Sequence, residues 1–304
     1  MRIVTRPDFD GIVCAVLIRE AENITQPIYW VEPYEVQSRA ADIRPGDILA
    51  NLPYDARCSY WFDHHYSNRL NVAFKGSYKI APSAAGVVYK YYQKRLHRDY
   101  SELIRETDRI DSADLTLDEV LHPAKYPYVL LSMTIISHDG VDEPYWNDLV
   151  NMLAHAPVDS IIQKQTVKDR CTALVNENKA YHRLLTQNTV LKDHVSITDF
   201  RSLGIDPAGN RFLVYSLFPE SVVNIKIRYD DKDRENVTIS VGHSIFNRRC
   251  NVNVGSLLAQ FGGGGHPGAG GCRVHASQAD GILARIETAL LANESGKLGA
   301  ELKK

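Results

Sequence analysis

Cysteine is scarce in this chain of 304 residues, and its pattern excludes a disulfide framework or a zinc cage. The cysteines are odd in number and widely spaced, and no CxxC pair occurs among Cys14, Cys58, Cys171, Cys250 and Cys272. This usage is typical of reduced thiols, so we expect a cytoplasmic protein.

Two further absences narrow the class of protein. No apolar run is long enough to span a bilayer, and the first residues, MRIVTRPDFD, lack the apolar core of a signal peptide. The formal net charge is −2, whereas a protein that grips long nucleic acid usually carries a basic excess. We therefore expect no membrane partner, and a small anionic substrate or one held at a few points.

The N-terminal half alternates short apolar runs with helical patterns. RIVT, PIYWVEP, GDILANLP and CSYWF read as strands, whereas DGIVCAVLIREAE and SAAGVVYKYYQKRL have the spacing of helices. Strands that alternate with helices predict an α/β fold with a parallel sheet and right-handed crossovers. From about residue 99 the pattern turns helical, and we place this first domain at residues 1–155.

The second half has a different character. Residues 157–192 predict one long helix, because no proline or glycine interrupts them after Pro157. We place it in a helical linker at 156–193, with a homodimer seam as the alternative to a simple connector. A smaller α+β domain is predicted at 194–292 and a flexible polar tail at 293–304. The predicted strands are VSITDF, RFLVYSLF, VVNIKIRY, NVTISVGH and CRVHA, and the predicted helices are VGSLLAQF and SQADGILARIETALLAN.

Acidic and imidazole side chains follow the predicted strands of the first domain. Asp8 and Asp10 come directly after the first strand, at the edge of a parallel sheet where ligands gather. Helix capping explains one aspartate there but explains two less well. Asp63, His64 and His65 end a later strand, where the alternative is a turn with surface histidines.

A third cluster, TDRIDSAD, places Asp108, Asp111 and Asp114 in or beside a helix, and alone it would read as a solvated acidic helix end. Together the clusters offer carboxylates and imidazole without thiolate, which suits Mn²⁺ or Mg²⁺. Several bridging aspartates can hold two cations roughly 3.5–4 Å apart, as two-metal hydrolases do. The sequence therefore predicts a metal site that acts on phosphate.

These motifs resemble the DHH phosphoesterase superfamily, and most of all its exopolyphosphatase-related branch. The chain has D-x-D-G, then DHH after an apolar strand, a helical aspartate and a distal GGGH, in that order over roughly residues 1–290. The resemblance implies an N-terminal DHH domain with two Mn²⁺, a helical linker and a C-terminal DHH-associated domain that binds substrate.

The resemblance also implies roles for individual residues. Asp8 and Asp10 match the first motif, one for each metal, and Asp108 matches a bridging aspartate. Asp63 opens the DHH motif and is one of the expected metal ligands, His64 matches a metal-ligating histidine, and His65 matches a histidine that faces the phosphate.

Two positions depart from the family pattern. Val4 stands where the first motif usually has a histidine, and Asn51 stands where the second motif usually has a bridging aspartate. Asn51 is a neutral and weaker ligand. Both departures affect the same metal site, so we expect that site to be altered while the site of Asp10, His64 and Asp108 is intact.

The glycine run FGGGGHPGAGG is the main motif of the second domain. Glycines let backbone N–H groups approach an anion, so the run predicts a phosphate nest, with a flexible turn as the alternative. In the family this motif contacts substrate, which makes Gly264, Gly265 and His266 candidates. His243 and Arg248 lie just upstream as further candidates, although Arg248 could equally be a solvated loop arginine.

The prediction is a Mn²⁺-dependent phosphohydrolase, with one or two ions and Mg²⁺ as a substitute. Asp63 and His65 are the predicted catalytic residues, and short oligonucleotides or nucleotides are the predicted substrates. Two alternatives stay open: an exopolyphosphatase that acts on inorganic polyphosphate, and a nucleotide-binding protein that has lost catalysis.

Overall fold

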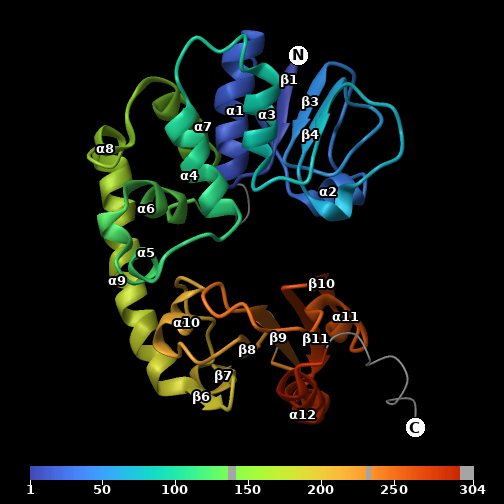
Figure 1. Cartoon of the computed structure of the whole chain (residues 1–304), viewed down its shortest axis with the longest axis vertical. Helices are drawn as coiled ribbons and strands as arrows, with labels where there is room; N and C mark the ends of the chain where they lie inside the picture. The colour runs from blue at the N-terminus through green and yellow to red at the C-terminus, as the bar shows by residue number, and fades with distance from the viewer. Residues whose placement is uncertain (136–141, 231–233, 295–304) are drawn as a thin grey trace. The chain divides into compact units, whose positions relative to one another are not determined.

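The computed structural model describes residues 1–135, 142–230 and 234–294 (Figure 1). The chain forms two compact units: Met1–Leu115 with Pro123–Thr172, and Thr116–His122 with Ala173–Lys304. The division along the main chain falls inside helix α9 (Gln165–Asn188), which therefore belongs to both units.

The first unit is built on a parallel sheet of five strands, in the order β2-β1-β3-β4-β5. The strands are β1 (Arg2–Thr5), β2 (Tyr29–Trp30), β3 (Asp47–Ala50), β4 (Tyr60–Asp63) and β5 (Gly76–Tyr78). This architecture confirms the predicted α/β fold. All four residues of β3 are buried, as expected for an inner strand of a parallel sheet.

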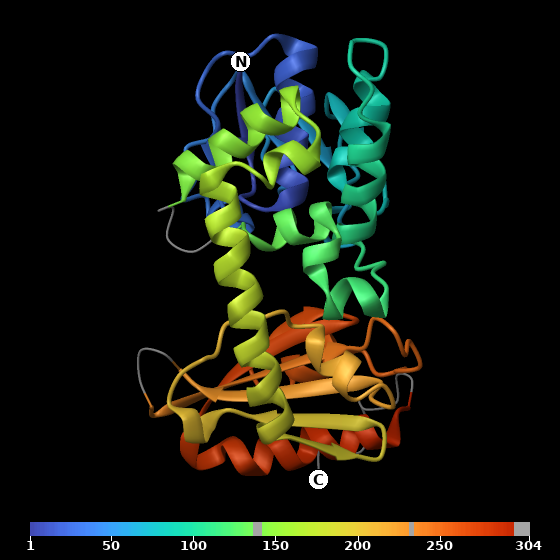
Figure 2. The same cartoon turned by 90° about the vertical axis from the view of Figure 1, so that its left-hand side faces the viewer.

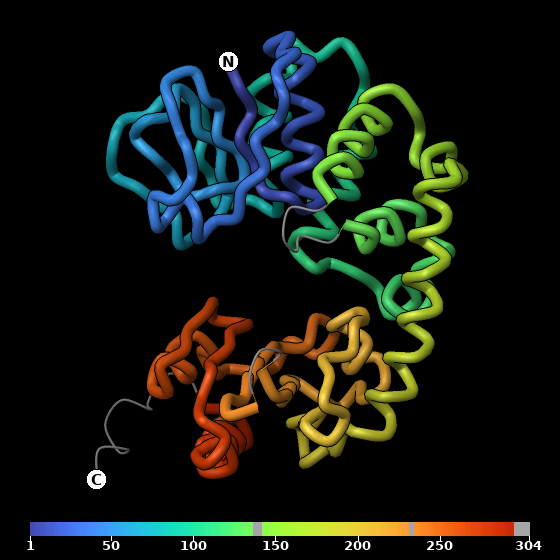
Figure 3. The backbone as a smooth tube through the Cα atoms, turned by 180° about the vertical axis from the view of Figure 1, so that it is seen from behind, coloured from blue at the N-terminus to red at the C-terminus, as the bar shows by residue number. Residues whose placement is uncertain are grey.

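Helices pack against this sheet and against one another. Helix α1 packs against α3, α4 and α7 (Figure 3). All of its residues from Phe9 to Ile18 are buried. On another part of the sheet, Trp61 packs in a cluster with Tyr54, Phe74 and Tyr78. The helices of this unit are α1 (Phe9–Glu22), α2 (Pro33–Gln37), α3 (Ala84–Tyr92), α4 (Ser101–Asp111), α6 (Pro127–Met133), α7 (Glu143–His155) and α8 (Val158–Ile161), with 3-10 turns at Tyr66–Asn68 and Pro123–Lys125.

The second unit has a six-stranded mixed sheet in the order β10-β11-β9-β8-β7-β6, in which only the β7–β8 pair is parallel among the described residues. Helix α12 lies along one face of this sheet and buries Ala279, Ile286 and Leu290 there (Figure 2). The strands are β6 (Thr189–Lys192), β7 (Val195–Asp199), β8 (Val223–Tyr229), β9 (Asn236–His243), β10 (Gly264–His266) and β11 (Ala269–His275). The helices are α5 (Leu117–Leu121), α10 (Leu213–Leu217), α11 (Val254–Ala259) and α12 (Ala276–Ala292), with a 3-10 turn at Arg201–Leu203.

Two predicted elements are wrong. The helix expected over 157–192 is interrupted between Ile161 and Gln165, and its last four residues form β6. A turn at Asp193, whose φ is +53°, folds the β-branched end of this segment back onto β7, and sheet pairing there replaces helix. RFLVYSLF contains α10 instead of a strand, and burial of Leu213, Val214 and Tyr215 fixes it. The predicted tail lies outside the described residues from 295 onward.

Candidate metal centre

Three neighbouring strands of the first unit deliver polar side chains to one edge of the sheet. Asp8 follows β1, Asn51 follows β3, and His64 follows β4. Because these strands are parallel and adjacent, their carboxyl ends lie at the same edge. The strand ends therefore gather the side chains that the sequence analysis selected.

Asp8 caps helix α1. Its Oδ1 accepts the N–H of Gly11 at 2.8 Å and the amide of Asn51 at 2.9 Å. A Cβ at Gly11 would lie 2.0 Å from the carbonyl oxygen of Arg6, so only glycine allows this tight entry into the helix. The capping alternative is thus confirmed for Asp8, and it leaves Asp10 to be explained.

Asp10 is buried in the interior of the unit. Its carboxylate accepts the N–H groups of Ala84 at 2.9 Å and Ala85 at 2.7 Å, which belong to the first turn of α3. Burial, together with the negative charge of Asp8, raises the pKa of Asp10 to about 7. No guanidinium or ammonium group lies beside this buried carboxylate among the described residues, so a bound cation would compensate its negative charge.

A hydrogen bond at one ring nitrogen of His64 leaves the other nitrogen able to bind a metal. Nδ1 lies 2.9 Å from the carbonyl oxygen of Ala81, and because a carbonyl only accepts, Nδ1 carries the proton. The lone pair is then on Nε2, which is buried and has no hydrogen-bond partner within the described ranges. Nε2 lies 3.7 Å from Asp10 Oδ2 and 3.4 Å from Asp111 Oδ2. Burial and the neighbouring His65 lower the pKa of His64, which favours the neutral ligand form.

These residues fit a divalent cation. The ligand atoms of Asp10, His64 and Asp111 all lie within 4.8 Å of one another. Nε2 of His64 lacks the partner that a buried polar group needs, whereas the Asp10 carboxylate accepts two backbone N–H groups. The amide oxygen of Asn51 is also buried and unpaired in the described structure, and it offers a further oxygen ligand. Two carboxylates, an imidazole and no thiolate suit Mn²⁺ or Mg²⁺.

Within helix α4, Asp111 is the carboxylate beside His64 Nε2, whereas Asp108 bonds Ser83, and the ligand role of Asp108 stays a prediction. The hydroxyl of Ser83 donates to Asp108 Oδ1 at 2.5 Å, and burial raises the pKa of Asp108. Asp111, one helical turn later, is the carboxylate that joins Asp10 and His64. The sequence pattern contains both aspartates, but only the packing of Ser83 against Asp108 shows which one reaches the imidazole.

Asp63 and His65 form a separate hydrogen-bonded unit. Asp63 is fully buried, and its oxygens lie 2.8 Å from His65 Nδ1 and 2.7 Å from the amide nitrogen of Asn68. Burial lowers the pKa of His65, but the hydrogen bond and charge of Asp63 outweigh this effect and leave that pKa raised. Oδ1 of Asp63 therefore orients His65, while Oδ2 accepts the amide N–H of Asn68. Ligand atoms of Asp63, His64 and His65 also lie within 4.8 Å of one another, so the ligand role of Asp63 stays a prediction. The sequence analysis missed Asn68, since an amide five residues after an aspartate is no signal by itself.

The candidate residues of the second unit gather at the edge of its sheet. The glycine run forms the β10–β11 hairpin, in which Gly265 has a φ of +147° and a Cβ would lie 2.3 Å from the carbonyl oxygen of Ala269. Close packing therefore accounts for Gly265, whereas a Cβ at Gly264 would meet no atom within 4 Å. His266 is exposed on the same short strand.

His243 joins this hairpin to the loop that follows β9. Its backbone N–H donates to Gly268 at 2.8 Å, and its Nε2 lies 3.0 Å from the carbonyl oxygen of Val252. Burial lowers the pKa of His243, which favours the neutral ring. Arg248 lies in the same loop, where its Nε donates to the carbonyl of Ile245 at 3.0 Å.

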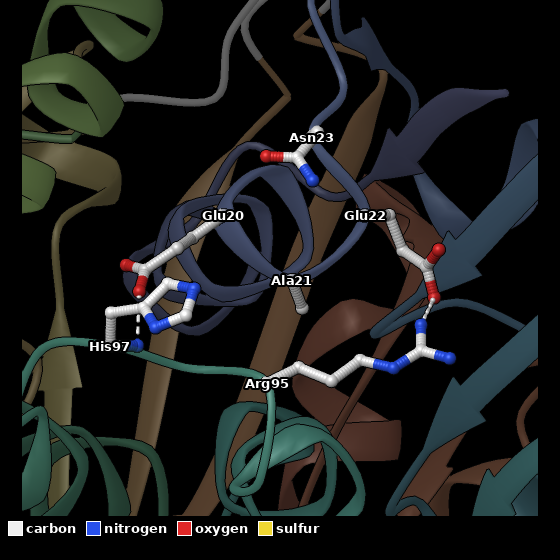
Figure 4. A pocket seen from close by; sticks show the side chains of 6 residues that line it. All are labelled: Glu20, Ala21, Glu22, Asn23, Arg95 and His97. Carbon is white, nitrogen blue, oxygen red and sulfur yellow. Dashed lines mark hydrogen bonds and ion pairs between the residues drawn. The ribbon is translucent and has the colours of Figure 1, made fainter.

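A surface pocket of about 400 Å³ lies elsewhere in the first unit, at the C-terminal end of α1 (Figure 4). Its two glutamates have partners within the pocket. Arg95 forms an ion pair with Glu22 at 2.8 Å, and the backbone N–H of His97 donates to Glu20 at 2.6 Å. Glu20 is ten residues from Asp10 along α1, which corresponds to about 15 Å. This pocket is therefore separate from the candidate metal centre.

Comparison with known proteins identifies the family. No family model matches the sequence, and a search of curated proteins found no match. Among solved structures, the pGpG-specific phosphodiesterase PggH from Vibrio cholerae is similar at 31% identity with a TM-score of 0.83, covering 96% of this chain and 99% of that one. The chain belongs to the DHH phosphoesterase superfamily.

More distant DHH proteins share the fold. An exopolyphosphatase-related protein from Bacteroides fragilis is 11% identical with a TM-score of 0.55, covering 96% of this chain and 93% of that one. RecJ from Thermus thermophilus, in complex with Mn²⁺, is 13% identical with a TM-score of 0.55, covering 96% of this chain and 52% of that one.

As a DHH protein, this chain is a phosphohydrolase. The donor set at Asp10, His64 and Asp111 agrees with that chemistry, because hydrolysis at phosphorus needs a cation that carboxylates and imidazole hold. All five cysteines are free thiols. Within the described residues, none of the helices combines the length and apolar character needed to cross a bilayer.

Proposed function

We propose that this DHH phosphohydrolase cleaves the phosphodiester bond of a linear dinucleotide, with pGpG as the first substrate to test. The observation that carries the proposal is the 31% identity with the pGpG-specific phosphodiesterase over 96% of this chain. The metal-binding geometry supports it, since the donors that such hydrolysis needs converge at one sheet edge. Two molecules of GMP would be the products.

We place one divalent cation, Mn²⁺ or Mg²⁺, on Asp10, His64 and Asp111. Such a cation lowers the pKa of a bound water and polarises a phosphoryl oxygen when substrate is present. Asn51 is a further ligand in this proposal, because its buried amide oxygen has no other partner in the described part of the chain. Asp108 supports the site indirectly, because it accepts a hydrogen bond from Ser83, the N-cap residue of α3.

His65 is the proposed phosphate-facing catalytic residue. Asp63 holds Nδ1, so Nε2 is the nitrogen that can donate toward a phosphoryl oxygen. The raised pKa of His65 favours the protonated ring, and a positive donor stabilises the charge that grows on phosphate during attack. Asp63 then acts through His65, as a positioning residue rather than as a metal ligand.

The second unit would bind the remainder of the substrate. Gly264 leaves open space beside its backbone, and His266 is exposed on the same strand, so both can approach an anion. His243, the last residue of β9, would offer the lone pair of Nδ1 as an acceptor, and Arg248 in the following loop would add a cation. In this proposal the first unit supplies the chemistry, and the second unit supplies recognition.

The test is a hydrolysis assay with the full chain and Mn²⁺, followed by chromatography of the products. Release of GMP from pGpG, lost in His65→Ala and retained in His155→Ala, supports the proposal. His155 is a matched control, since it is an exposed histidine at the C-terminal end of α7 that bonds only its own helix in the described structure.

Parallel reactions decide between the alternatives. Phosphate release from inorganic polyphosphate, without cleavage of pGpG, would replace the proposal with an exopolyphosphatase. Tight binding of pGpG without turnover at any Mn²⁺ concentration would replace it with a nucleotide-binding protein. The homodimer stays a prediction that the elution volume of the purified chain would check.

A further inference from the structure

The two aspartates of the first motif have opposite surroundings. Asp8 Oδ1 already accepts protein N–H groups from Gly11 and Asn51. Its other oxygen, Oδ2, lies 3.3 Å from Nε of Arg6. Asp10, in contrast, has backbone donors but no guanidinium or ammonium beside it in the described ranges. Among the described residues, the chain therefore pairs Asp8 with a guanidinium and leaves Asp10 without one.

Arg6 is held at this place from two sides. Its Nε lies 3.3 Å from Asp8 and 3.4 Å from Glu32, the residue that begins helix α2. The side chain is 37% exposed, so part of it is fixed within the site while part faces solvent. A guanidinium stays protonated at all ordinary pH values, and its charge at Asp8 is therefore permanent.

Val4, which lies before Arg6 and Asp8 in the chain, offers no metal ligand. Val4 is fully buried in β1, with an apolar side chain packed in the cluster around Leu49 and Trp61. The side-chain N–H of Asn51 donates a hydrogen bond to Asp8, and the side chain carries no negative charge. A second divalent cation beside Asp8 would thus meet the repulsion of Arg6, whose guanidinium already lies against the carboxylates of Asp8 and Glu32.

We propose that Arg6 takes the place of a second metal ion, so that this centre works with one divalent cation on Asp10, His64 and Asp111 and one guanidinium on Asp8. The inference rests on the proposed function, because it concerns the same site. It assigns Arg6 as a positioning residue that fixes the charge and orientation of Asp8.

The experiment counts manganese ions in the full-length chain. Metal is removed with a chelator, Mn²⁺ is titrated by calorimetry, and the spectrum of bound Mn²⁺ is recorded by electron paramagnetic resonance. Two ions about 3.5–4 Å apart are exchange-coupled, whereas a single ion gives the isolated six-line spectrum. Wild type and Arg6→Lys are expected to bind one ion with the isolated spectrum.

Arg6→Ala removes the permanent charge and exposes Asp8 to solvent cations. We expect this variant to bind a second ion and to show the coupled spectrum. Arg44→Ala is the control, since Arg44 is an exposed arginine that also pairs with an aspartate two residues away, Asp42, at the opposite end of β3. This control is expected to keep one ion.

A coupled spectrum in wild type would overturn the inference, as would an Arg6→Ala variant that still binds only one ion. The wild-type spectrum alone decides the stoichiometry if Arg6→Ala does not fold. Ion counts do not depend on which substrate is cleaved. Failure of pGpG hydrolysis with one bound ion would therefore refute the proposed function and leave this inference standing.

Discussion

Replacing Asp111 with asparagine tests the arrangement of the metal centre most directly. Asp111 Oδ2 lies 3.4 Å from His64 Nε2, at the end of α4, with its side chain 29% exposed. The change removes one negative ligand and keeps the shape of the side chain, so the metal-free fold is expected to be unaffected. Asp108→Asn is the matched control on the same helix, because Asp108 bonds Ser83.

The expected size of the effect follows from linkage. At a Mn²⁺ concentration about 1,000 times Kd, binding stabilises wild type by about 4.1 kcal/mol. Loss of a residue that merely supports a metal ligand weakens binding by up to about 100-fold, and we take this value for Asp111→Asn. The same Mn²⁺ concentration is then about 10 times Kd and stabilises by only about 1.4 kcal/mol.

The assay is thermal unfolding with and without Mn²⁺. The missing stabilisation of about 2.7 kcal/mol corresponds to a Tm lower by about 5–10 °C for a domain of 150–250 residues. Asp108→Asn should lower the Tm with and without Mn²⁺ alike, and so keep the metal-induced shift. If Asp111→Asn keeps the wild-type shift while Asp108→Asn loses it, Asp108 is the ligand and the arrangement described above is wrong.

Three other outcomes are expected. The pKa of Asp10 is about 7 in the folded chain and 3.8 in the unfolded chain, so the folded state binds more protons between these pH values. Without metal, the free energy of unfolding should therefore fall as the pH rises through this window. Thermal melts should also show a larger Mn²⁺ shift at pH 8 than at pH 6, and equal shifts would contradict the assignment. Asn68→Ala leaves an oxygen of buried Asp63 unpaired, so it should lower the free energy of unfolding, measured in denaturant, by about 1–3 kcal/mol. The variant should also have a lower kcat and an unchanged affinity for Mn²⁺. A changed affinity would make Asp63 a metal ligand. Gly265→Ala forces a side chain to within 2.3 Å of the Ala269 carbonyl at a φ of +147°, so it should raise KM for pGpG and leave the Mn²⁺ count intact; an unchanged KM would remove the hairpin from the substrate site.

Local patterns were enough to predict much of this centre. Strand ends followed by Asp8, Asp63 and His64 are readable because a parallel sheet places all its carboxyl ends together. Ser83 caps α3 and accepts the N–H of Gly86 at 2.9 Å, and a serine just before an apolar helical run is likewise a local signal.

Contacts between distant segments could not be predicted in the same way. Asp108 and Asp111 lie one turn apart on α4, and only the position of Ser83, 25 residues before Asp108, decides which one faces His64. The pairing of Arg6 with Glu32 depends on how α2 follows β2, which no spacing in the sequence reveals. The end of α9 was missed for a similar reason, because Thr189–Lys192 suits a helix until β7 is there to pair with it.

The way α3 begins has a consequence for watching this protein at work. The N–H groups of Ala84 and Ala85 both point at the carboxylate of Asp10, and the N–H of Gly86 points at Ser83. Anything that binds or protonates Asp10 therefore changes how firmly two particular amide protons are held. Hydrogen–deuterium exchange at these two alanines would serve as a built-in gauge of the ion, readable from the backbone without a substrate or a label.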